Sequence, residues 1–331
     1  MTMTRFGYTL MTEQSPPRPL VGYAATAEQA GFDFLVCSDH YFPWLESMGH
    51  SPYAWSVLGA VTQVTERVEL LTYVTCPTMR YHPAVVAQKA ATVGLLSEGR
   101  FTLGLGSGEN LNEHVIGQGW PAVAVRQEML EEAAMIIRRL LDGEQLTVEG
   151  DYFRVDQARL WDLPEQAVEI GIAVGGEEAV RRFATVADHL IATEPSEELV
   201  STWQQARQVG GMERSRAIGQ VPVCWGPDKS AAVERAHELF RWFGGGWQVN
   251  ADLPTPAGFE GASQFVRPDD VASAIACGPD LDELVDSLRP FWEAGFTDVA
   301  LVQIGDESQE QFLNEIAPQL LDKLRAAAPS D

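Results

Sequence analysis

The strongest constraint on the fold is an alternation, along the whole chain, of short apolar or β-branched runs with longer segments of helical period. Runs of about four to eight such residues are typical of buried strands, and apolar residues three and four apart are typical of helices. Eight strands are expected: Phe6–Leu10, Phe34–Ser38, Val68–Thr75, Phe101–Gly106, Glu169–Val174, His189–Ala192, Ile218–Cys224 and Asp298–Ile304. The expected helices are Leu20–Ala30, Ala84–Leu96, Arg126–Leu141, Glu177–Ala187, Glu197–Gln208, Lys229–Phe243, Leu281–Ala294 and Gln309–Ala327.

Strands that are followed by helices, without a series of hairpins, favour a parallel sheet with crossover helices. Eight is the number of strands that closes a (β/α)8 barrel, so the sequence predicts an α/β fold built as one such TIM barrel. The alternative is a doubly wound open sheet. It is disfavoured because no Gly-x-Gly-x-x-Gly motif follows the first strand.

Two stretches interrupt this rhythm, Gly108–Ala124 and Gly244–Pro268, and both are rich in Gly or Pro with little periodicity. Loops of this length in a compact domain are usually lids or binding loops. The chain has no internal repeat and no linker. We therefore expect a single domain over residues 1–331, with insertions near 108–124 and 244–268 that serve as lid or substrate loops.

Charge and composition exclude several classes of function. The chain has 23 Lys and Arg against 47 Asp and Glu, a formal net charge of −24, which disfavours binding to nucleic acid or to anionic membranes. It has no apolar run of about 18 residues and no signal-peptide pattern at its start, so we expect a cytoplasmic protein without membrane spans. Its four cysteines form no Cys-x-x-Cys pair, so a zinc or redox motif is absent.

The residues that follow the predicted strands carry the functional signal, because catalytic groups of a barrel come from the carboxyl ends of its strands. Five consecutive strand ends bear small, hydroxylated or ionisable side chains. They are Ser38-Asp39-His40, Thr75-Cys76-Pro77-Thr78, Gly106-Ser107-Gly108-Glu109-Asn110-Leu111-Asn112, Gly175-Gly176 and Thr193-Glu194. We expect all of them on one rim of the barrel.

Each of these features also has a purely structural interpretation. Asp39 could cap a helix beside a structural histidine, the glycines near residue 107 could form a plain turn, and Trp44 could belong to the core. Gly175-Gly176 could merely allow a helix to pack closely on a strand. The functional interpretation is favoured over these structural ones because all of the residues are expected on one face of the barrel.

The chemistry suggested by this rim is proton-coupled transfer to a planar cofactor. A histidine such as His40 can serve as an acid or a base, and Glu109 could exchange a second proton from the other side of the pocket. Gly175-Gly176 at the start of a helix exposes backbone N–H groups that suit a phosphate. The six histidines show no paired spacing of metal ligands, so we expect no metal site.

These residues resemble a known family. Thr12-Glu13-Gln14, Ser38-Asp39-His40 with Pro43-Trp44, Pro77-Thr78 with Arg80-Tyr81, Gly106 to Glu113, Gly150-Asp151-Tyr152-Phe153 and Gly175-Gly176 are similar to the luciferase-like barrel superfamily. Within it, they resemble the branch of coenzyme F420-dependent glucose-6-phosphate dehydrogenase. The resemblance covers nearly the whole chain and is stronger before about residue 193.

The resemblance implies a deazaflavin cofactor, F420, in the barrel mouth, and a role for each of four residues. His40 would accept the proton of a substrate hydroxyl, Glu109 would protonate the deazaflavin, Trp44 would support the developing charge, and Glu13 would line the pocket. The implied cofactor contacts are Asp39, Val74, Cys76, Ser107, Gly108, Asn112, Gly175 and Gly176. The resemblance also implies a cis peptide bond at Tyr73–Val74 and a homodimer.

The chain departs from this family at Cys76, where the dehydrogenase has a threonine, and at the phosphate-binding residues. Thr193 matches a substrate-side position, but Ser196 stands where the family has a lysine, and Gly244–Pro268 contains no lysine for a second one. The family's arginine falls near Ala274. A sugar phosphate needs cationic donors, so glucose 6-phosphate is not the expected substrate. Whether Arg241 or Arg267 replaces the missing cations stays open.

Three functions remain. The first is an F420-dependent oxidoreductase acting on a carbinol carbon of a small alcohol, hemiacetal or sugar. The second is an FMN-dependent monooxygenase of the same fold, and the third is a non-catalytic F420- or flavin-binding protein. The combination of His40 and Glu109 favours the first, because a dehydrogenase needs a base and a proton donor in one pocket.

Overall fold

Eight parallel strands close on themselves in the structure, a computed structural model that describes residues 4–212 and 215–329. The strand order is β11-β1-β2-β3-β4-β7-β8-β9, and β9 pairs with both β8 and β11, which closes the barrel. The strands are β1 (Arg5–Leu10), β2 (Phe34–Cys37), β3 (Glu69–Thr72), β4 (Phe101–Leu105), β7 (Glu169–Ala173), β8 (His189–Ile191), β9 (Ala217–Cys224) and β11 (Asp298–Gln303). The predicted barrel is confirmed, and each predicted strand overlaps one observed strand.

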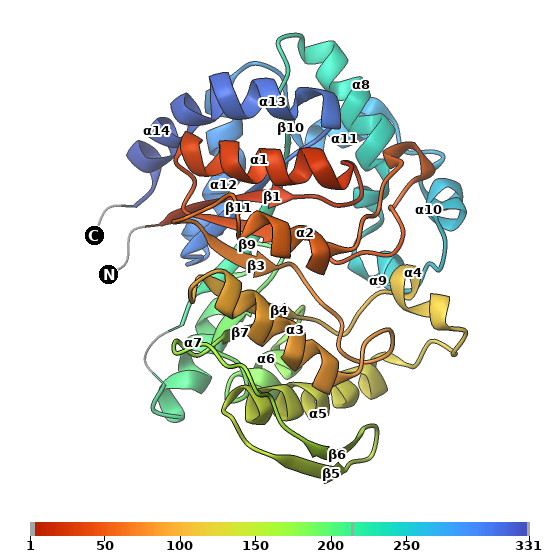
Figure 1. Cartoon of the computed structure of the whole chain (residues 1–331). Helices are drawn as coiled ribbons and strands as arrows, with labels where there is room; N and C mark the ends of the chain where they lie inside the picture. Colours follow the sequence, from red (N-terminus) through yellow and green to blue (C-terminus); the bar gives the residue numbers. More distant parts are fainter. Residues whose placement is uncertain (1–3, 213–214, 330–331) are drawn as a thin grey trace.

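Helices surround the barrel, as Figure 1 shows. They are α1 (Pro17–Ala30), α2 (Ala54–Val61), α3 (Pro83–Leu96), α5 (Val123–Leu141), α6 (Glu177–Phe183), α7 (Glu197–Val209), α8 (Lys229–Phe240), α12 (Leu281–Glu293) and α14 (Ala317–Ala327). The expected last helix is divided by a π-helical turn at Phe312–Ile316. Within the described residues, no helix is long and apolar enough to cross a membrane.

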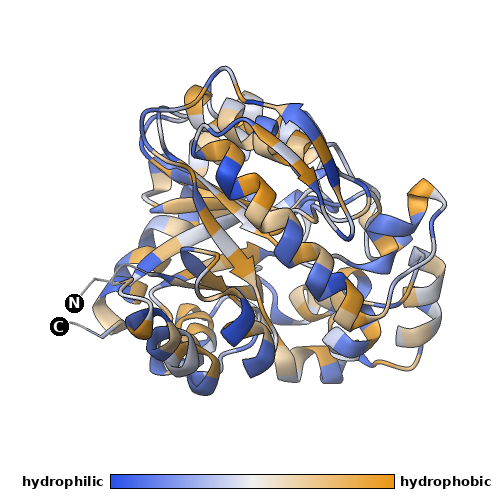
Figure 2. Ribbon diagram, turned by 90° about the horizontal axis from the view of Figure 1, so that it is seen from below, coloured by the Kyte–Doolittle hydropathy of each residue, from blue (hydrophilic) through white to orange (hydrophobic). Residues whose placement is uncertain are grey.

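Side chains alternate between the inside and the outside of the barrel. In β2, Phe34 and Val36 join an interior cluster with Leu71 and Ile191, whereas Leu35 and Cys37 pack against the helices. The parallel register sets Leu10 beside Cys37 and Cys37 beside Thr72. Figure 2 shows hydrophobic residues concentrated along the strands and on the faces of the helices that cover them. This packed interior fixes the strand ends that build the site.

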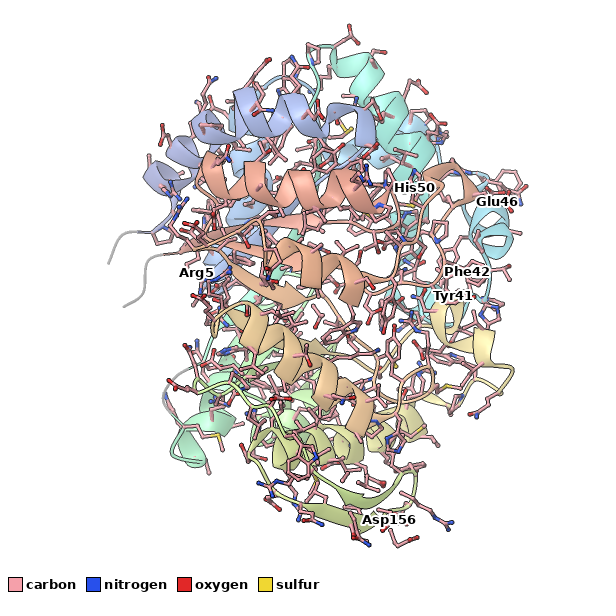
Figure 3. The ribbon with its side chains drawn as sticks, in the orientation of Figure 1. Arg5, Tyr41, Phe42, Glu46, His50 and Asp156 are labelled. Atoms are coloured by element: carbon pink, nitrogen blue, oxygen red, sulfur yellow. The ribbon has the colours of Figure 1, made fainter. Side chains whose placement is uncertain are left out.

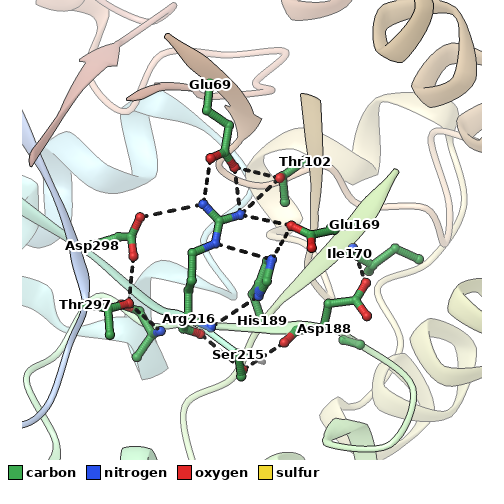
Figure 4. A network of polar contacts seen from close by, with 12 residues as sticks. Glu69, Thr102, Glu169, Ile170, Asp188, His189, Ser215, Arg216, Thr297 and Asp298 are labelled. Atoms are coloured by element: carbon green, nitrogen blue, oxygen red, sulfur yellow. Dashed lines mark hydrogen bonds and ion pairs between the residues drawn. The ribbon is translucent and has the colours of Figure 1, made fainter. Parts of the chain in front are cut away.

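The amino-terminal end of the barrel is closed by a network of charged residues (Figure 4). The guanidinium of Arg216 lies 2.7 Å from Glu69, 3.5 Å from Glu169 and 3.6 Å from Asp298, and His189 lies 2.8 Å from Glu169. Burial favours the neutral form of Glu69, but the charges of Arg216 and Arg5 outweigh it and lower the pKa of Glu69 to about 2. We call this cluster the barrel floor.

The sequence-based prediction of two long loops is wrong in part. Residues 244–268 contain α9 (Trp247–Asn250) and α10 (Pro256–Ser263), and α11 (Pro268–Ala274) begins at their end. Thr255 caps α10 through a hydrogen bond from the Gly258 N–H to its Oγ1, at 3.2 Å. Pro256 and Pro268 occupy first helical positions, where the missing N–H costs nothing. Proline density here marks helix starts rather than a loop. Residues 108–124 likewise contain α4 (Asn110–Glu113).

Three further features were not predicted. The helix α2 follows β2, and an antiparallel hairpin of β5 (Leu146–Glu149) and β6 (Arg154–Ala158) lies outside the barrel. The Glu132 carboxylate of α5 accepts the backbone N–H groups of Asp151, Tyr152 and Phe153 at 2.8–3.3 Å, which fixes the hairpin turn. A short strand, β10 (Ala276–Cys277), also pairs with β9.

Candidate active site

The polar residues singled out from the sequence meet at the carboxyl ends of the strands. Figure 3 shows Tyr41, Phe42, Glu46 and His50, which all follow β2, at the end of the barrel opposite Arg5. Figure 1 places α4, α9 and α10 at this same end. The backbone N–H of Asn110 in α4 bonds to the carbonyl of Ala251 after α9, at 2.9 Å, so the two insertions touch here.

His40 lies between two carboxyl groups. Its Nδ1 is 3.4 Å from Glu13 Oε1 and its Nε2 is 3.3 Å from Glu109 Oε2. Its Nδ1 is also 3.2 Å from the carbonyl oxygen of Phe42. The side chains of His40 and Glu13 are 8% and 2% exposed, and that of Glu109 is 16% exposed. The predicted meeting of Glu13, His40 and Glu109 is therefore present in the structure.

The two carboxyl groups have different surroundings. Glu13 accepts hydrogen bonds from the hydroxyls of Thr12 and Ser38. Burial raises the pKa of Glu109, and the nearby Glu13 adds to this rise, while His40 and the amide of Asn112 oppose it. The surroundings of Glu109 thus favour its protonated form.

An aromatic column covers one side of His40. The rings of His40 and Trp44 are 4.9 Å apart, and Trp44 stacks on Trp242 at 4.1 Å with an interplanar angle of 9°. Phe259 of α10 meets the Trp44 ring at 5.1 Å, edge to face. Trp242 and Phe259 come from the segment between β9 and β10, so this segment forms a wall of the site.

Asp39 is buried, and its side chain is fully used by protein partners. Its Oδ2 accepts hydrogen bonds from Trp55 and Thr75, and its Oδ1 from Arg80 and Tyr81, at 2.8–3.3 Å. An ionised carboxylate has about four acceptor positions. A cofactor contact at Asp39 is therefore confined to its main chain unless one of these bonds is given up.

The segment after β3 carries the cis peptide bond expected at Tyr73–Val74. Gly104 in β4 and Gly106 directly after it allow this segment to pack closely against β4. A Cβ at Gly104 would lie 1.9 Å from the Thr72 carbonyl oxygen, and one at Gly106 would lie 2.6 Å from Val74. The expected contacts Val74 and Ser107 are both partly exposed at this rim.

Cys76 is buried against Gly108. Gly108 has φ +82°, and a Cβ there would lie 2.6 Å from the Cys76 sulfur. The sulfur is 3.0 Å from the Thr78 hydroxyl. Burial and the nearby Glu113 raise the pKa of Cys76 far above its usual value, so its sulfur stays a neutral thiol. Cys76 shapes the rim through packing.

Asn112 links the ends of β2 and β4. Its Oδ1 accepts the backbone N–H groups of Tyr41 and Phe42 at 2.8 and 3.3 Å, and its Nδ2 donates to Glu109 at 2.7 Å. One amide N–H of Asn112 remains for a ligand. The sequence placed Asn112 at the end of a strand and, through the family resemblance, among the cofactor contacts, but its link between the segment after His40 and Glu109 was not predicted.

The expected phosphate-binding glycines leave open space. Added Cβ atoms at Gly175 and Gly176 would meet nothing within 4 Å among the described residues, so close helix packing does not explain these glycines. Gly176 has an extended backbone, with φ −167°, at the start of α6. The following Glu177 pairs with Arg181. A ligand would find room at this rim.

The expected substrate-side residues lie across the mouth, because β8 is four strands around the barrel from β2. Thr193 is exposed, and Ser196 caps α7 by accepting a hydrogen bond from Leu199 at 3.3 Å. Arg267 pairs with Asp270 at 3.0 Å with 76% of its side chain exposed, and Arg241 donates to the Glu238 carbonyl at 2.8 Å. Both cations thus already have partners near their own backbone.

Comparison with known proteins gives the family. A family model of luciferase-like monooxygenases matches residues 1–298. The chain belongs to this family. The F420-dependent glucose-6-phosphate dehydrogenases of Beutenbergia cavernae and Microbacterium testaceum are 35% and 34% identical to it over 336 and 333 residues. The first match covers 98% of both chains and the second 97% of both.

Solved structures of luciferase-like proteins agree. An F420-dependent secondary alcohol dehydrogenase in complex with an F420-acetone adduct superposes with a TM-score of 0.89 at 27% identity, covering 98% of this chain and 99% of that one. The F420-dependent tetrahydromethanopterin reductase of Methanopyrus kandleri superposes with a TM-score of 0.74 at 18% identity, which supports the fold alone. The family expected from the strand-end motifs is confirmed.

Three residues of this luciferase-like site were not assigned a role from the sequence. Arg80 and Glu113 form a buried pair beneath Asp39, and Trp242 supports Trp44. Arg80 and Glu113 lie within segments that carry the resemblance, so a signal was present. Trp242 lies within a predicted helix, and its contact with Trp44 joins positions far apart in the sequence.

Proposed function

We propose that this protein is an F420-dependent oxidoreductase that transfers a hydride between a carbinol carbon of a small organic substrate and the deazaflavin. The observation that carries the proposal is the placement of His40 between Glu13 and Glu109 in the barrel mouth, beside the Trp44 ring. The F420-dependent relatives, at 35% identity over nearly the full length, support it. So does the similarity to a secondary alcohol dehydrogenase.

The residues present fit this cofactor. The open space at Gly175 and Gly176 would accommodate a phosphodiester near backbone N–H groups, and Ser107 and Asn112 offer polar groups at the end of β4, the strand next to β7. The segment Tyr73–Val74, at the end of β3, lies on the other side of β4 from these glycines. When bound, F420 supplies the carbon that accepts or returns the hydride.

The surroundings of His40 indicate how it would act. Its Nδ1 faces two acceptors, Glu13 and the Phe42 carbonyl, so the proton of the neutral ring belongs on Nδ1. The lone pair would then lie on Nε2, which faces Glu109 at 3.3 Å, and it would accept the hydroxyl proton of the substrate while Glu109 carries a proton. Glu13 then stabilises the positive charge that forms on the ring.

Glu109 would exchange the second proton, with the cofactor. Burial raises its pKa, which favours the protonated acid that this role needs. The side-chain amide of Asn112 donates a hydrogen bond to Glu109 Oε2 at 2.7 Å, which fixes the position of this carboxyl group. Trp44, held by Trp242, offers a flat apolar surface next to the reacting groups and excludes water from them.

The binding test of this proposal compares two cofactors. We expect F420 to bind with micromolar or better affinity, and FMN at least about tenfold more weakly, as followed by fluorescence quenching during titration. Gly176→Val is the matched variant: its added side chain enters open space, so the protein should fold while F420 binding weakens. Equal or tighter binding of FMN would contradict the assignment and favour the monooxygenase alternative.

The substrate test concerns the phosphate. We expect glucose 6-phosphate to be turned over at least about tenfold less efficiently than the best neutral alcohol, hemiacetal or sugar. The reason is that one charge-assisted hydrogen bond contributes about 1.5–3 kcal/mol, and three cationic positions of the family are missing. Steady-state kcat/KM values across a substrate panel decide this. Efficient, saturable turnover of the phosphate ester would show that another cation serves.

The segment between β9 and β10 is proposed to form the substrate-side wall, since Trp242 and Phe259 both contact Trp44. A single domain over residues 1–331, a homodimer and a cytoplasmic location stay predictions.

A further inference from the structure

Both chain neighbours of His40 are held by side chains from other strand ends. On one side, the Arg80 guanidinium donates to the backbone carbonyl of Asp39 at 2.7 Å. On the other side, the amide oxygen of Asn112 accepts the backbone N–H of Tyr41 at 2.8 Å. The peptide groups flanking His40 therefore cannot shift without breaking one of these bonds.

Arg80 is itself held by Glu113. The Glu113 carboxylate accepts the Arg80 backbone N–H at 2.8 Å, and its second oxygen lies 3.5 Å from Arg80 Nε. The two side chains are 8% and 1% exposed. Among the described residues, neither Nε nor that second oxygen has a hydrogen bond, so the ion pair is their main compensation. Removing Arg80 would leave the Glu113 carboxyl buried without this cation, whereas removing Glu113 would leave Arg80 paired with Asp39.

This arrangement connects the base to the acid. Asn112 and Glu113 belong to α4, and Glu109 is the residue directly before this helix, at its N-cap position. Asn112 also donates directly to Glu109. The helix that carries Glu109 is thus bonded to both sides of His40, on one side through Asn112 and on the other through Glu113 and Arg80. We call Arg80, Asn112 and Glu113 the His40 clamp.

We propose that Arg80, as the central member of the His40 clamp, is a positioning residue that sets the distance between His40 and Glu109. This inference rests on the proposed function. Arg80 does its work through the Asp39 carbonyl and through Glu113, and it takes no part in proton transfer itself. Without it, the segment 39–42 would be attached to α4 through Asn112 alone.

The first test separates turnover from binding. Misplacing a catalytic group by about 1 Å can cost up to roughly 10²-fold, so Arg80→Met should lower the rate of hydride transfer by about 10- to 100-fold. The affinity for F420 should stay within about threefold. Arg80→Lys keeps one donor to the Asp39 carbonyl and should recover part of the rate.

The matched control is Arg100→Met. Arg100 also donates to backbone carbonyls, those of Thr65 and Val68 at 2.9 and 2.7 Å, but it lies at the amino-terminal end of the barrel. The Arg100→Met variant therefore shows how much the rate of hydride transfer falls when a half-buried arginine far from His40 is lost. A rate loss in Arg80→Met that is no larger than in Arg100→Met would overturn the proposal.

The second test uses the cofactor-free protein and does not depend on turnover. Hydrogen exchange of the peptide containing residues 39–42 reports how firmly the Tyr41 and Phe42 N–H groups are held. We expect exchange there to be at least about tenfold faster in Arg80→Met than in the wild type or in Arg100→Met. Unchanged exchange would overturn the clamp.

The outcomes distinguish the two proposals. If wild-type protein neither binds nor reduces F420, the proposed function fails, while the exchange experiment still decides the clamp. If Arg80→Met loses F420 affinity in proportion to its rate, Arg80 acts on binding and the positioning role is wrong.

Discussion

Replacing His40 with alanine should lower the rate of hydride transfer by roughly 10²–10⁴-fold, the usual contribution of a positioned general base. The structure gives the reason. In the proposed mechanism the lone pair of His40 lies on Nε2, because Nδ1 faces Glu13 and the Phe42 carbonyl while Nε2 faces Glu109, whose raised pKa favours the protonated acid. Rapid mixing of the variant with F420 and substrate, followed by deazaflavin absorbance, measures the step directly.

The affinity of His40→Ala for F420 should change little, because the cofactor contacts proposed at Ser107, Asn112, Gly175 and Gly176 do not involve the imidazole. His82→Ala is a suitable control, since His82 is an exposed histidine that caps α3. A His40→Ala variant that retains most of its turnover would remove His40 from the mechanism.

The second large effect is expected at the barrel floor. Arg216→Met should lower the free energy of unfolding by about 3–5 kcal/mol, the usual cost of breaking a buried ion pair from one side. Arg216 is the shared partner of Glu69, Glu169 and Asp298, and the Asp298 side chain is only 1% exposed. Urea unfolding followed by circular dichroism measures the change.

The pH dependence of stability should change in the same variant. The pKa of Glu69 is about 2 in the folded protein and 4.5 as its ordinary value. Glu69 therefore contributes stability that is fully present above about pH 4.5 and is lost as the pH falls toward 2. Burial raises the pKa of Asp298, which opposes this trend in part.

Arg216→Met should flatten the part of the acid profile due to Glu69, because the charge that lowers the Glu69 pKa is gone. Arg289→Met breaks an exposed ion pair with Asp286 and should change stability far less. Equal losses in the two variants would contradict the stabilising role of the floor.

The fold could be predicted because each strand is marked locally. Runs such as Phe34–Cys37 and residues 299–302 are apolar on both faces, as is typical of buried parallel strands, and helical periods separate them. The segment between β9 and β10 could not be predicted in this way. Its helices α9, α10 and α11 are four to eight residues long, which is too short for a clear helical period, and the glycines and prolines around them are typical of loops.

Part of the site could be predicted for a related reason. Carboxyl ends of parallel strands meet by geometry, which brings Glu13, His40 and Glu109 together once the barrel is assumed. The partners of Asp39 could not be foreseen, because they come from α2, from the end of β3 and from the turn before α3. The stack of Trp44 on Trp242 joins residues 198 positions apart, a contact that no local pattern encodes.

Closure of the barrel also affects how copies of the protein behave in concentrated solution. A closed sheet has no unpaired edge onto which a strand of a neighbouring molecule could add. Among the described strands, the remaining edges belong to β10, two residues long, and to the hairpin of β5 and β6. The hairpin exposes Glu149, Arg154 and Asp156, charges that oppose such pairing. With mutual repulsion from a net charge of −24, the folded protein is expected to resist aggregation at high concentration.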